Sequence, residues 1–275
     1  MQRMSSQFTE KETESYYDAE DAIYRAVWDE DGSVHWGLFD ETTGQDFLAA
    51  CANLDRMMVD KGRIDSNSRV LDLGCGNGAT AIALSTRQGC HVTGIDLSGV
   101  RIGNAQKARE SQGPEAQQKL AFQKASATAL PFPDGSFTHV WSQAVIYHVP
   151  DKRTVLKEVY RVLAPGGIMV FDDLTKPQKD ISPEGQKYVY ERLLYDTEFN
   201  FESYQESLVA QGFRVLEAQD LSQHLKTSYL ILADRTPKGE SEHAERYEYL
   251  TKAYLETAAA VDKQEVGWGF FVCQK

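Results

Sequence analysis

The sequence predicts an α/β protein with a doubly wound, mostly parallel sheet of seven strands and helices on both faces. Two observations indicate this class. Between residues 69 and 173, short apolar segments alternate with helical segments of about 10–15 residues, which is the pattern of βαβ units. The first apolar segment runs directly into the stretch GCGNG, which places three glycines in five positions. Glycines at such a corner allow a ligand to approach the backbone.

The same alternation gives each element in order. Strands are expected at residues 69–72, 91–96, 120–123, 138–143 and 168–173, followed by an antiparallel pair at 213–218 and 267–275. Helices are expected at 79–87, 100–111 and 151–163 between the strands, and at 184–195, 202–211 and within 221–263 after the fifth strand. The segment PGG separates the third of these helices from the fifth strand.

The chain divides into three expected parts. Residues 1–15 are polar and lack periodicity, so we expect them to be disordered. Residues 16–62 are expected to form a helical flap over the active site, in which Phe47, Cys51 and Leu54 begin an apolar helical face that Gly62 ends. Residues 63–275 are expected to form the main domain, with a cap inserted at about 174–265.

Composition excludes several classes of function. A net charge of −12 repels phosphate backbones, so we expect no nucleic-acid partner. The four cysteines form no C-x-x-C pair, so their spacing supports neither a zinc site nor a disulfide framework and fits a reducing cytoplasm. No apolar run approaches the roughly 18 residues of a membrane span, and the polar N-terminus lacks a secretory signal. We therefore expect a cytoplasmic protein with a small-molecule partner and no metal; the sequence allows a homodimer.

The glycine turn leaves two kinds of ligand open. Gly74, Gly76 and Gly78 lie where ligands of open α/β sheets bind, and Asp96 ends the second strand, where a carboxylate can accept both hydrogens of a ribose. GCGNGA also fits the dinucleotide pattern G-x-G-x-x-G/A. Asp72 favours the other alternative, because a carboxylate two residues before the first glycine suits a ligand ammonium and repels a pyrophosphate.

Four segments occur in the order VLDLGCGNGAT, ASATALPF, DGSFTHV and RVLAPGG between residues 70 and 173. With them the sequence resembles the class I S-adenosylmethionine-dependent methyltransferases, which implies a Rossmann-like fold and that cofactor. The cofactor-binding residues that the resemblance implies are Asp72, Gly74 and Gly76 at the methionine part, Asp96 at the ribose, Leu97 beside the adenine, Ala127 or the flanking Ser126 at the adenine amino group, and Gln143 at the methionine part or the sulfonium. Ser126 departs from the family, in which an Asp is common at this position.

The flanks YYDAEDAIYRAVWDEDGSVHWGLFD and GWGFFVCQK resemble the glycine, sarcosine and dimethylglycine N-methyltransferases, although DEDGS replaces the Gly-rich run of that family. Related tocopherol methyltransferases share parts of these flanks. Aromatic faces stabilise a desolvated cation, so we expect Tyr17 and Trp28 to contact the cofactor. The spacing of Tyr17, Tyr24 and Trp28 fits equally well the buried face of a covering helix.

An amino acid acceptor carries a carboxylate, and Arg192, twelve residues before Tyr204, matches an Arg and a Tyr of the N-methyltransferases. Arg25 and Lys226 are alternatives for this role. The candidate acceptor-binding residues are His35, Tyr24, Trp36, Tyr147, Arg192 and Tyr204, and the candidate catalytic residues are His148 and Asp173.

The expected activity is methyl transfer from S-adenosylmethionine to a small molecule. The preferred acceptor is the nitrogen of a small amine or amino acid in the series from glycine to dimethylglycine, with betaine as the end product. The alternative is an oxygen, carbon or sulfur acceptor on another small metabolite or on a quinol- or tocopherol-type ring. From other classes, the sequence leaves open a dinucleotide-dependent oxidoreductase and a cofactor-binding regulator without turnover.

Overall fold

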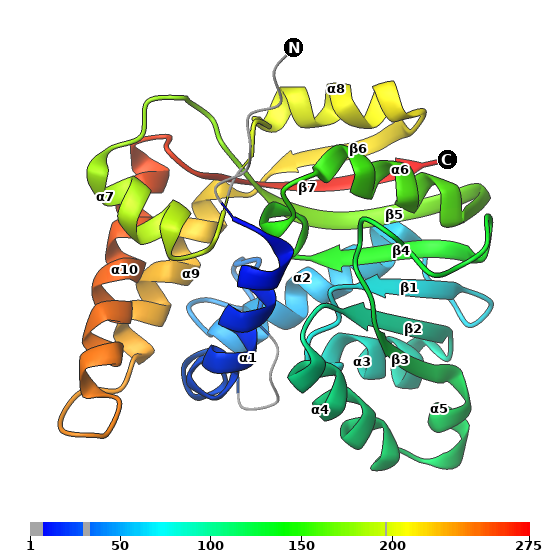
Figure 1. Cartoon of the computed structure of the whole chain (residues 1–275), viewed down its shortest axis with the longest axis horizontal. Coiled ribbons are helices and arrows are strands. Elements are labelled where there is room, and N and C mark those ends of the chain that lie inside the picture. The colour runs from blue at the N-terminus through cyan, green and yellow to red at the C-terminus, as the bar shows by residue number, and fades with distance from the viewer. Residues whose placement is uncertain (1–7, 30–33, 196) are drawn as a thin grey trace.

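A seven-stranded sheet forms the centre of the computed structural model, which describes residues 8–29, 34–195 and 197–275 (Figure 1). Its order is β3-β2-β1-β4-β5-β7-β6. The strands are β1 (Arg69–Leu73), β2 (His91–Asp96), β3 (Leu120–Lys124), β4 (Phe137–Gln143), β5 (Leu163–Thr175), β6 (Arg214–Asp220) and β7 (Gly267–Gln274). The neighbours from β3 to β5 pair in parallel, and β7 is antiparallel to both β5 and β6. The predicted fold class is confirmed.

The alternation of side chains along each strand divides the core into two layers. Val70 and Val170 belong to one buried cluster, whereas the next residues, Leu71 and Phe171, belong to the other. The first cluster includes residues of α2 (Phe47–Gly62), α3 (Ala79–Gln88), α4 (Gly99–Glu110) and α9 (Ser222–Arg235). The second cluster includes residues of α6 (Lys152–Val162) and α8 (Phe201–Gln211). Helices therefore cover both faces of the sheet.

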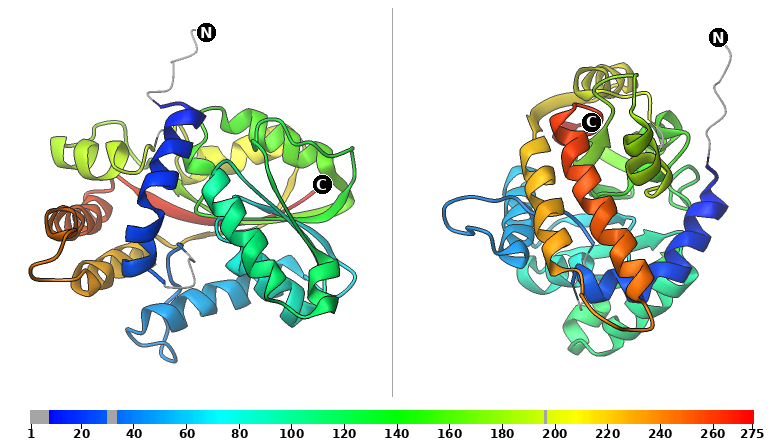
Figure 2. Two further views of the ribbon diagram at one scale, coloured as in Figure 1. Left: turned by 60° about the horizontal axis from the view of Figure 1, so that its bottom comes forward. Right: turned by 90° about the vertical axis from the view of Figure 1, so that its left-hand side faces the viewer.

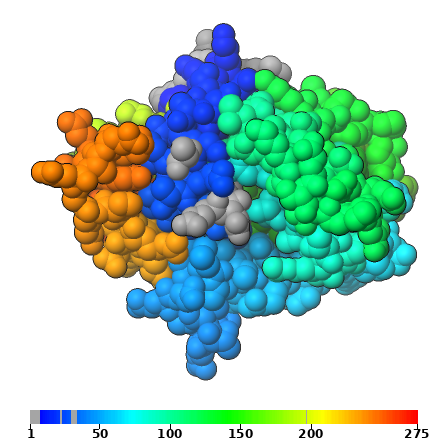
Figure 3. Space-filling model, turned by 90° about the horizontal axis from the view of Figure 1, so that it is seen from below, coloured from blue at the N-terminus to red at the C-terminus, as the bar shows by residue number. Residues whose placement is uncertain are grey.

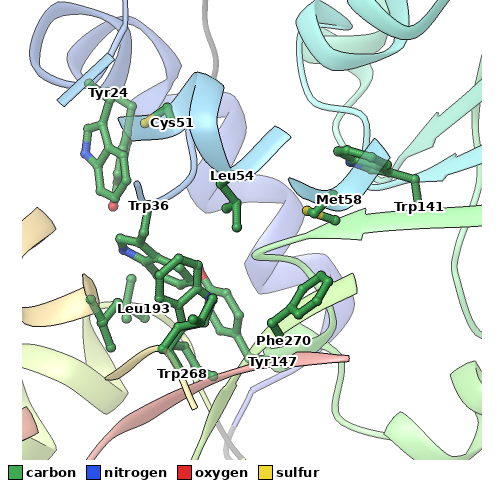
Figure 4. Packing of buried hydrophobic residues seen from close by; sticks show 14 of the residues in the cluster. Tyr24, Trp36, Cys51, Leu54, Met58, Trp141, Tyr147, Leu193, Trp268 and Phe270 are labelled. Carbon is green, nitrogen blue, oxygen red and sulfur yellow. The ribbon is translucent and has the colours of Figure 1, made fainter. Parts of the chain in front are cut away.

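Aromatic and aliphatic side chains fill the first layer beside the carboxyl ends of the strands. Figure 4 shows Leu54 and Met58 of α2 near Phe270, and Trp36 beside Trp268. The Trp36 and Trp268 rings lie 5.4 Å apart between centroids. Among the described residues, no helix has the length and apolarity that crossing a membrane requires.

The cap differs from the single insertion at about 174–265 that the sequence predicts. Residues 201–220 belong to the sheet layers, because β6 pairs with β7 and α8 packs against both of these strands. The cap therefore consists of two separate pieces. One is α7 (Pro183–Gly185) with the π-helical turn η2 (Gln186–Glu191), and the other is α9 with α10 (Ala244–Asp262), which lie side by side in Figure 2.

The N-terminal segment also differs from the prediction. Residues 10–15, which we expect to be disordered from the sequence, form the first turns of α1 (Glu10–Val27). Thr9 and Glu12 form a capping box that satisfies backbone N–H groups at the start of this helix, and the polar composition reflects this cap and an exposed face. Residues 1–7 of the predicted disordered segment lie outside the described residues.

Two smaller features were not anticipated. The left-handed residue that ends α2 is Arg63, with φ 55°, rather than Gly62. Gly62 instead allows close packing, because a Cβ there would lie 3.0 Å from Cγ1 of Val170. A short helix, α5 (Pro114–Lys119), precedes β3.

Candidate functional site

A cleft of about 1060 Å³, including its open mouth, lies at the carboxyl ends of β1, β2 and β4. This is where open α/β sheets bind ligands. The predicted site residues that line it are Asp72, Gly74, Gly76, Asp96, Leu97, Ala127, Gln143, Tyr17, His35 and His148. Segments far apart in the sequence, including α1 and the loop after β4, thus meet at one site.

The glycine turn after β1 forms the floor of the cleft, and its tight course explains the glycines. Gly74 has φ 80° and Gly78 has φ 86°, which are left-handed values that favour glycine. A Cβ on Gly74 would lie 2.3 Å from Cγ2 of Val145, and one on Gly78 would lie 2.9 Å from Cβ of Ala105. The turn therefore has no room for side chains at these two positions.

Asp72 presents an unsatisfied carboxylate oxygen at this turn. Its side chain is buried, and Oδ2 has no hydrogen-bond partner among the described residues. Burial, together with the charges of Asp96 and Asp55, raises the pKa of Asp72 to about 8. A buried carboxylate of this kind is stabilised by a cation, so this end of the cleft suits a ligand ammonium.

Asp96 braces the turn from the end of β2. Its Oδ2 accepts a hydrogen bond from the Gly76 amide at 2.9 Å, and its Oδ1 accepts one from the Ser98 amide at 2.8 Å. Each oxygen retains a further lone pair, so the carboxylate is held in place with acceptor capacity left for a ligand hydroxyl. Burial raises the pKa of Asp96, although Arg101 opposes this shift.

Four acidic residues on one face of α1 attach this helix along the rim of the cleft. They occur at helical spacing and pair with residues near the ends of β2 and β3: Glu10 with Ser126, Glu14 with Lys124, Asp18 with Ser98, and Asp21 with Arg101. Figure 3 shows α1 (blue) between the cap helices (orange) and the α4 side of the sheet (green). Ser126, predicted to contact adenine, instead directs its hydroxyl to Glu10 and lies outside the cleft lining.

Tyr17 and His148 meet at the wall of the cleft. The Tyr17 hydroxyl lies 2.5 Å from Nε2 of His148, and Cζ of Arg101 lies 4.2 Å from the centroid of the Tyr17 ring. Burial lowers the pKa of His148 to about 3 and raises that of Tyr17. Both groups are therefore uncharged at neutral pH, and the imidazole tautomer decides which of the two atoms donates.

The remaining aromatic candidates form a buried cluster between the cleft and the cap. The rings of Trp36 and Tyr147 lie 6.0 Å apart between centroids with their planes tilted by 35°, and Tyr24 donates or accepts a hydrogen bond with Tyr16. Trp28, predicted to contact the cofactor, instead donates from Nε1 to Tyr254 on α10. The alternative interpretation of Trp28 as a residue of a buried helix face is thus correct, because its indole serves the contact between α1 and the cap.

Arg192 lies in this aromatic cluster, behind the cleft. Its guanidinium is buried and lies over the rings of Tyr229 and Tyr254, at 5.5 and 5.3 Å from their centroids. It donates to the Tyr188 carbonyl and to Thr257, whereas Nη1 has no hydrogen-bond partner among the described residues. Within the same part of the chain no carboxylate forms an ion pair with it, which leaves a buried cation balanced only by tyrosines. The alternative Lys226 forms an ion pair with Asp262.

Two predicted residues lie on the opposite side of β5. Asp173, predicted to be catalytic, accepts hydrogen bonds from the Tyr147 amide and from the hydroxyl of Tyr204, predicted to bind the acceptor. Neither residue lines the cleft. Alternation along β5 points Asp173 into the second core layer, where Tyr204 of α8 also packs. There its carboxylate shapes the loop that carries Tyr147 and His148.

Several lining residues were missed. Arg101 falls in a predicted helix and Glu14 in the segment expected to be disordered, and only the fold brings them to the rim. Thr80 lies two residues after Gly78 at the start of α3, a position that could have been proposed because helix N-termini bind anions. Among the described residues, no group of three or more side chains could hold a metal ion.

Comparison with known proteins gives consistent matches. Residues 71–171 match the family model described as "Methyltransferase domain". The chain is 31% identical over 212 residues to the (+)-O-methylkolavelool synthase of Herpetosiphon aurantiacus, covering 77% of this chain and 73% of that protein. It is 28% identical over 268 residues to the sarcosine/dimethylglycine N-methyltransferase of Halorhodospira halochloris, covering 94% of both. Its fold matches a mycolic acid cyclopropane synthase complexed with SAH and CTAB at a TM-score of 0.84 and 19% identity, covering 98% of this chain and 99% of that chain.

The cleft residues fit S-adenosylmethionine. This molecule carries an ammonium and a sulfonium, and the orphaned oxygen of Asp72 lies where a cation is needed. Asp96 offers free acceptor capacity of the kind that a ribose requires, while the glycine turn leaves the backbone open to close approach. A dinucleotide fits less well, because its pyrophosphate would face Asp72.

Proposed function

Because this chain belongs to the S-adenosylmethionine-dependent methyltransferases, we propose that its acceptor is the nitrogen of a small amine that also carries a carboxylate, in the series from glycine to dimethylglycine. The transfer of a methyl group to a small molecule follows from the family. The choice of acceptor is the proposed step.

The buried guanidinium of Arg192 is the observation that supports this choice. An arginine without a carboxylate partner in an apolar cluster is costly unless an anion binds to it. Its side chain makes hydrogen bonds through Nε and Nη2, and Nη1 remains available for a carboxylate. An acceptor held there by its carboxylate would place its amine toward the cleft, on the side where Tyr17 and Tyr24 lie 6.2 Å apart between ring centroids.

The surrounding rings suit an amine that becomes cationic. Tyr24, Trp36 and Tyr147 lie in the buried cluster that adjoins the cleft. Aromatic faces within about 6 Å of a desolvated cation contribute roughly 0.5–2 kcal/mol each. The rings would thus stabilise the positive charge of a methylated amine without a protein carboxylate. Such a carboxylate would compete with the carboxylate of the acceptor for Arg192.

The residues of this chain contribute mainly by positioning and by excluding water. When bound, S-adenosylmethionine supplies an activated methyl group to the acceptor. The Tyr17–His148 pair is neutral and spans the wall of the cleft, so it orients the Tyr17 oxygen without placing a second positive charge near the reacting atoms. Asp173 holds the backbone of the loop that carries this histidine through the Tyr147 amide. Orientation of this kind can supply several kcal/mol of a reaction barrier.

An oxygen acceptor is the second candidate, and the same histidine favours it. A hydroxyl acceptor must lose a proton, and the neutral imidazole of His148 at the wall of the cleft carries one unprotonated nitrogen. The (+)-O-methylkolavelool synthase is a relative whose name indicates O-methylation. The low pKa of His148 makes it a weak base, which ranks this candidate below the amine.

Product analysis distinguishes the two candidates. The protein is incubated with methyl-labelled S-adenosylmethionine and a panel of glycine, sarcosine, dimethylglycine, the corresponding uncharged amines, phenols and hydroquinones, and the products are identified by mass spectrometry. We expect label in the amino acids and little in the amines that lack a carboxylate. Label confined to phenols, hydroquinones or other hydroxyl compounds would overturn the amine proposal.

A further inference from the structure

Asp55 lies directly behind the wall of the cleft. It is carried by α2, and its side chain is 29% exposed. It faces a separate groove between α2 and α3 that Thr80 and Trp141 also line. Asp55 does not line the cleft itself, so any influence on a ligand there acts through other residues.

One oxygen of this carboxylate contacts two residues of the cleft wall. Oδ1 accepts a hydrogen bond from Nε2 of Gln143 at 2.9 Å and lies 3.6 Å from Nε2 of His35. Gln143 and His35 both line the cleft. They come from β4 and from the segment between α1 and α2, and Asp55 is the group that joins them.

The contact fixes the orientation of the Gln143 amide. The Trp141 indole can only donate, and it donates to Oε1 of Gln143 at 2.9 Å, whereas the Asp55 carboxylate can only accept. A flipped amide would place donor against donor and acceptor against acceptor. One N–H of Gln143 is therefore left for a ligand in the cleft.

The imidazole of His35 contacts a polar group at each nitrogen. Its Nδ1 lies 3.1 Å from the Trp36 carbonyl, which can only accept, so Nδ1 carries a hydrogen. Nε2 on the other side of the ring lies 3.6 Å from Asp55, a contact beyond hydrogen-bond distance that attracts the ring when Nε2 also carries a hydrogen. The ring is buried, and these two contacts determine which edge it presents to the cleft.

The charge of Asp55 also reaches the inner end of the cleft. Burial is the main cause of the raised pKa of Asp72 and of Asp172, and in both cases the Asp55 carboxylate adds to the shift. The charge of Asp55 therefore acts on carboxyl groups that it does not contact. A negative field at this place favours a cationic ligand over a neutral one.

We propose that Asp55 is a positioning residue of the methyl-transfer site, which holds the Gln143 amide and the His35 imidazole against the cofactor and favours the sulfonium form over the product. The proposal rests on the cofactor that the family establishes and not on the proposed acceptor. It can therefore be tested without any acceptor.

The test measures binding of S-adenosylmethionine and S-adenosylhomocysteine by titration calorimetry. Asp55→Ala should weaken S-adenosylmethionine binding by about tenfold, because the hydrogen bond to Gln143 is charge-assisted. It should weaken S-adenosylhomocysteine binding less, because that molecule lacks the sulfonium charge. Asp55→Asn retains a carbonyl oxygen for Gln143, so we expect near-normal S-adenosylhomocysteine binding and a reduced preference for S-adenosylmethionine.

Asp60→Asn is the matched control, because Asp60 is exposed on the same helix and the substitution removes the same charge. It should change neither affinity by more than about twofold. If Asp55 acts through Gln143, the Asp55→Ala and Gln143→Ala variants should not be additive. Additive effects, or an Asp55→Ala variant that binds both molecules like the control, would overturn the proposal.

Discussion

The Tyr17 hydroxyl and Nε2 of His148 lie 2.5 Å apart and join α1 to the loop after β4 across the wall of the cleft. The two residues are separated by more than a hundred positions in the sequence; Tyr17 is half-buried, His148 is buried, and both are uncharged at neutral pH. The pair therefore couples the position of α1 to the loop that borders the cleft.

Tyr17→Phe tests this coupling. The ring and its contact with Arg101 remain, while Nε2 of His148 loses its hydrogen-bond partner. We expect a loss of about 1–3 kcal/mol in stability, because a buried polar atom is left unsatisfied, and a fall in kcat that exceeds the change in cofactor affinity. Tyr16→Phe is the control, since it removes a hydroxyl from the neighbouring residue, which does not line the cleft. Equal losses of kcat in the two variants would contradict a specific role for the pair.

The raised pKa of Asp72 predicts a pH dependence of stability. A carboxyl group whose folded pKa of about 8 exceeds its unfolded value near 4 binds more protons in the folded state between these values, so stability falls as pH rises through this range. From pH 6 to pH 9 the ligand-free protein should lose on the order of 2 kcal/mol through this group. Urea unfolding at several pH values measures it, and Asp72→Asn should flatten the profile over this range.

Binding of the cofactor should reverse this behaviour. A ligand ammonium beside Asp72 favours the carboxylate, so binding near pH 7 should release a proton. Calorimetry in buffers of different ionisation enthalpy counts the protons released. A release that is the same in Asp72→Asn as in the unsubstituted protein would show that another group titrates.

The crowding at Gly74 predicts a paired substitution. Gly74→Ala combines a left-handed φ of 80° with a Cβ placed 2.3 Å from Cγ2 of Val145, so we expect a loss of more than about 2 kcal/mol in stability. Val145→Ala removes the two nearest atoms, Cγ1 and Cγ2, and leaves Cβ at 2.9 Å. The double variant should recover stability relative to Gly74→Ala, while the cost of the φ value remains. Thermal unfolding of the three variants measures their stabilities. If the double variant is no more stable than Gly74→Ala, backbone strain alone accounts for the loss.

The sheet and the cofactor end of the cleft could be predicted from local pattern. Periodicity and the glycine turn locate β1, and strand topology then brings Asp72 and Asp96 to one edge. The acceptor side could not be predicted in this way. Trp28 and Tyr204 have the residue types of a binding pocket, but Trp28 packs against the cap and Tyr204 of α8 packs into the second core layer. Asp55 is invisible in sequence because its role arises from the packing of α2 against β4.

Arg192 provides the test of the proposed acceptor. Arg192→Leu removes a buried charge that has no carboxylate partner among the described residues, and it also removes the hydrogen bonds to the Tyr188 carbonyl and Thr257. These effects oppose each other, so the stability of the ligand-free protein should change by less than about 2 kcal/mol. The Michaelis constant for acceptors with a carboxylate should rise at least about tenfold, because a charged hydrogen-bond donor is lost from an apolar site. The Michaelis constants for amines without a carboxylate should not change. The Michaelis constant of Arg192→Lys for acceptors with a carboxylate should lie between those of the other two proteins, since lysine keeps the charge and loses the two parallel donors of arginine. Arg153→Leu is the surface control, as Arg153 pairs with Glu198 in solvent. An equal rise of the Michaelis constant for acceptors with and without a carboxylate would mean that Arg192 stabilises the cap and does not bind the acceptor.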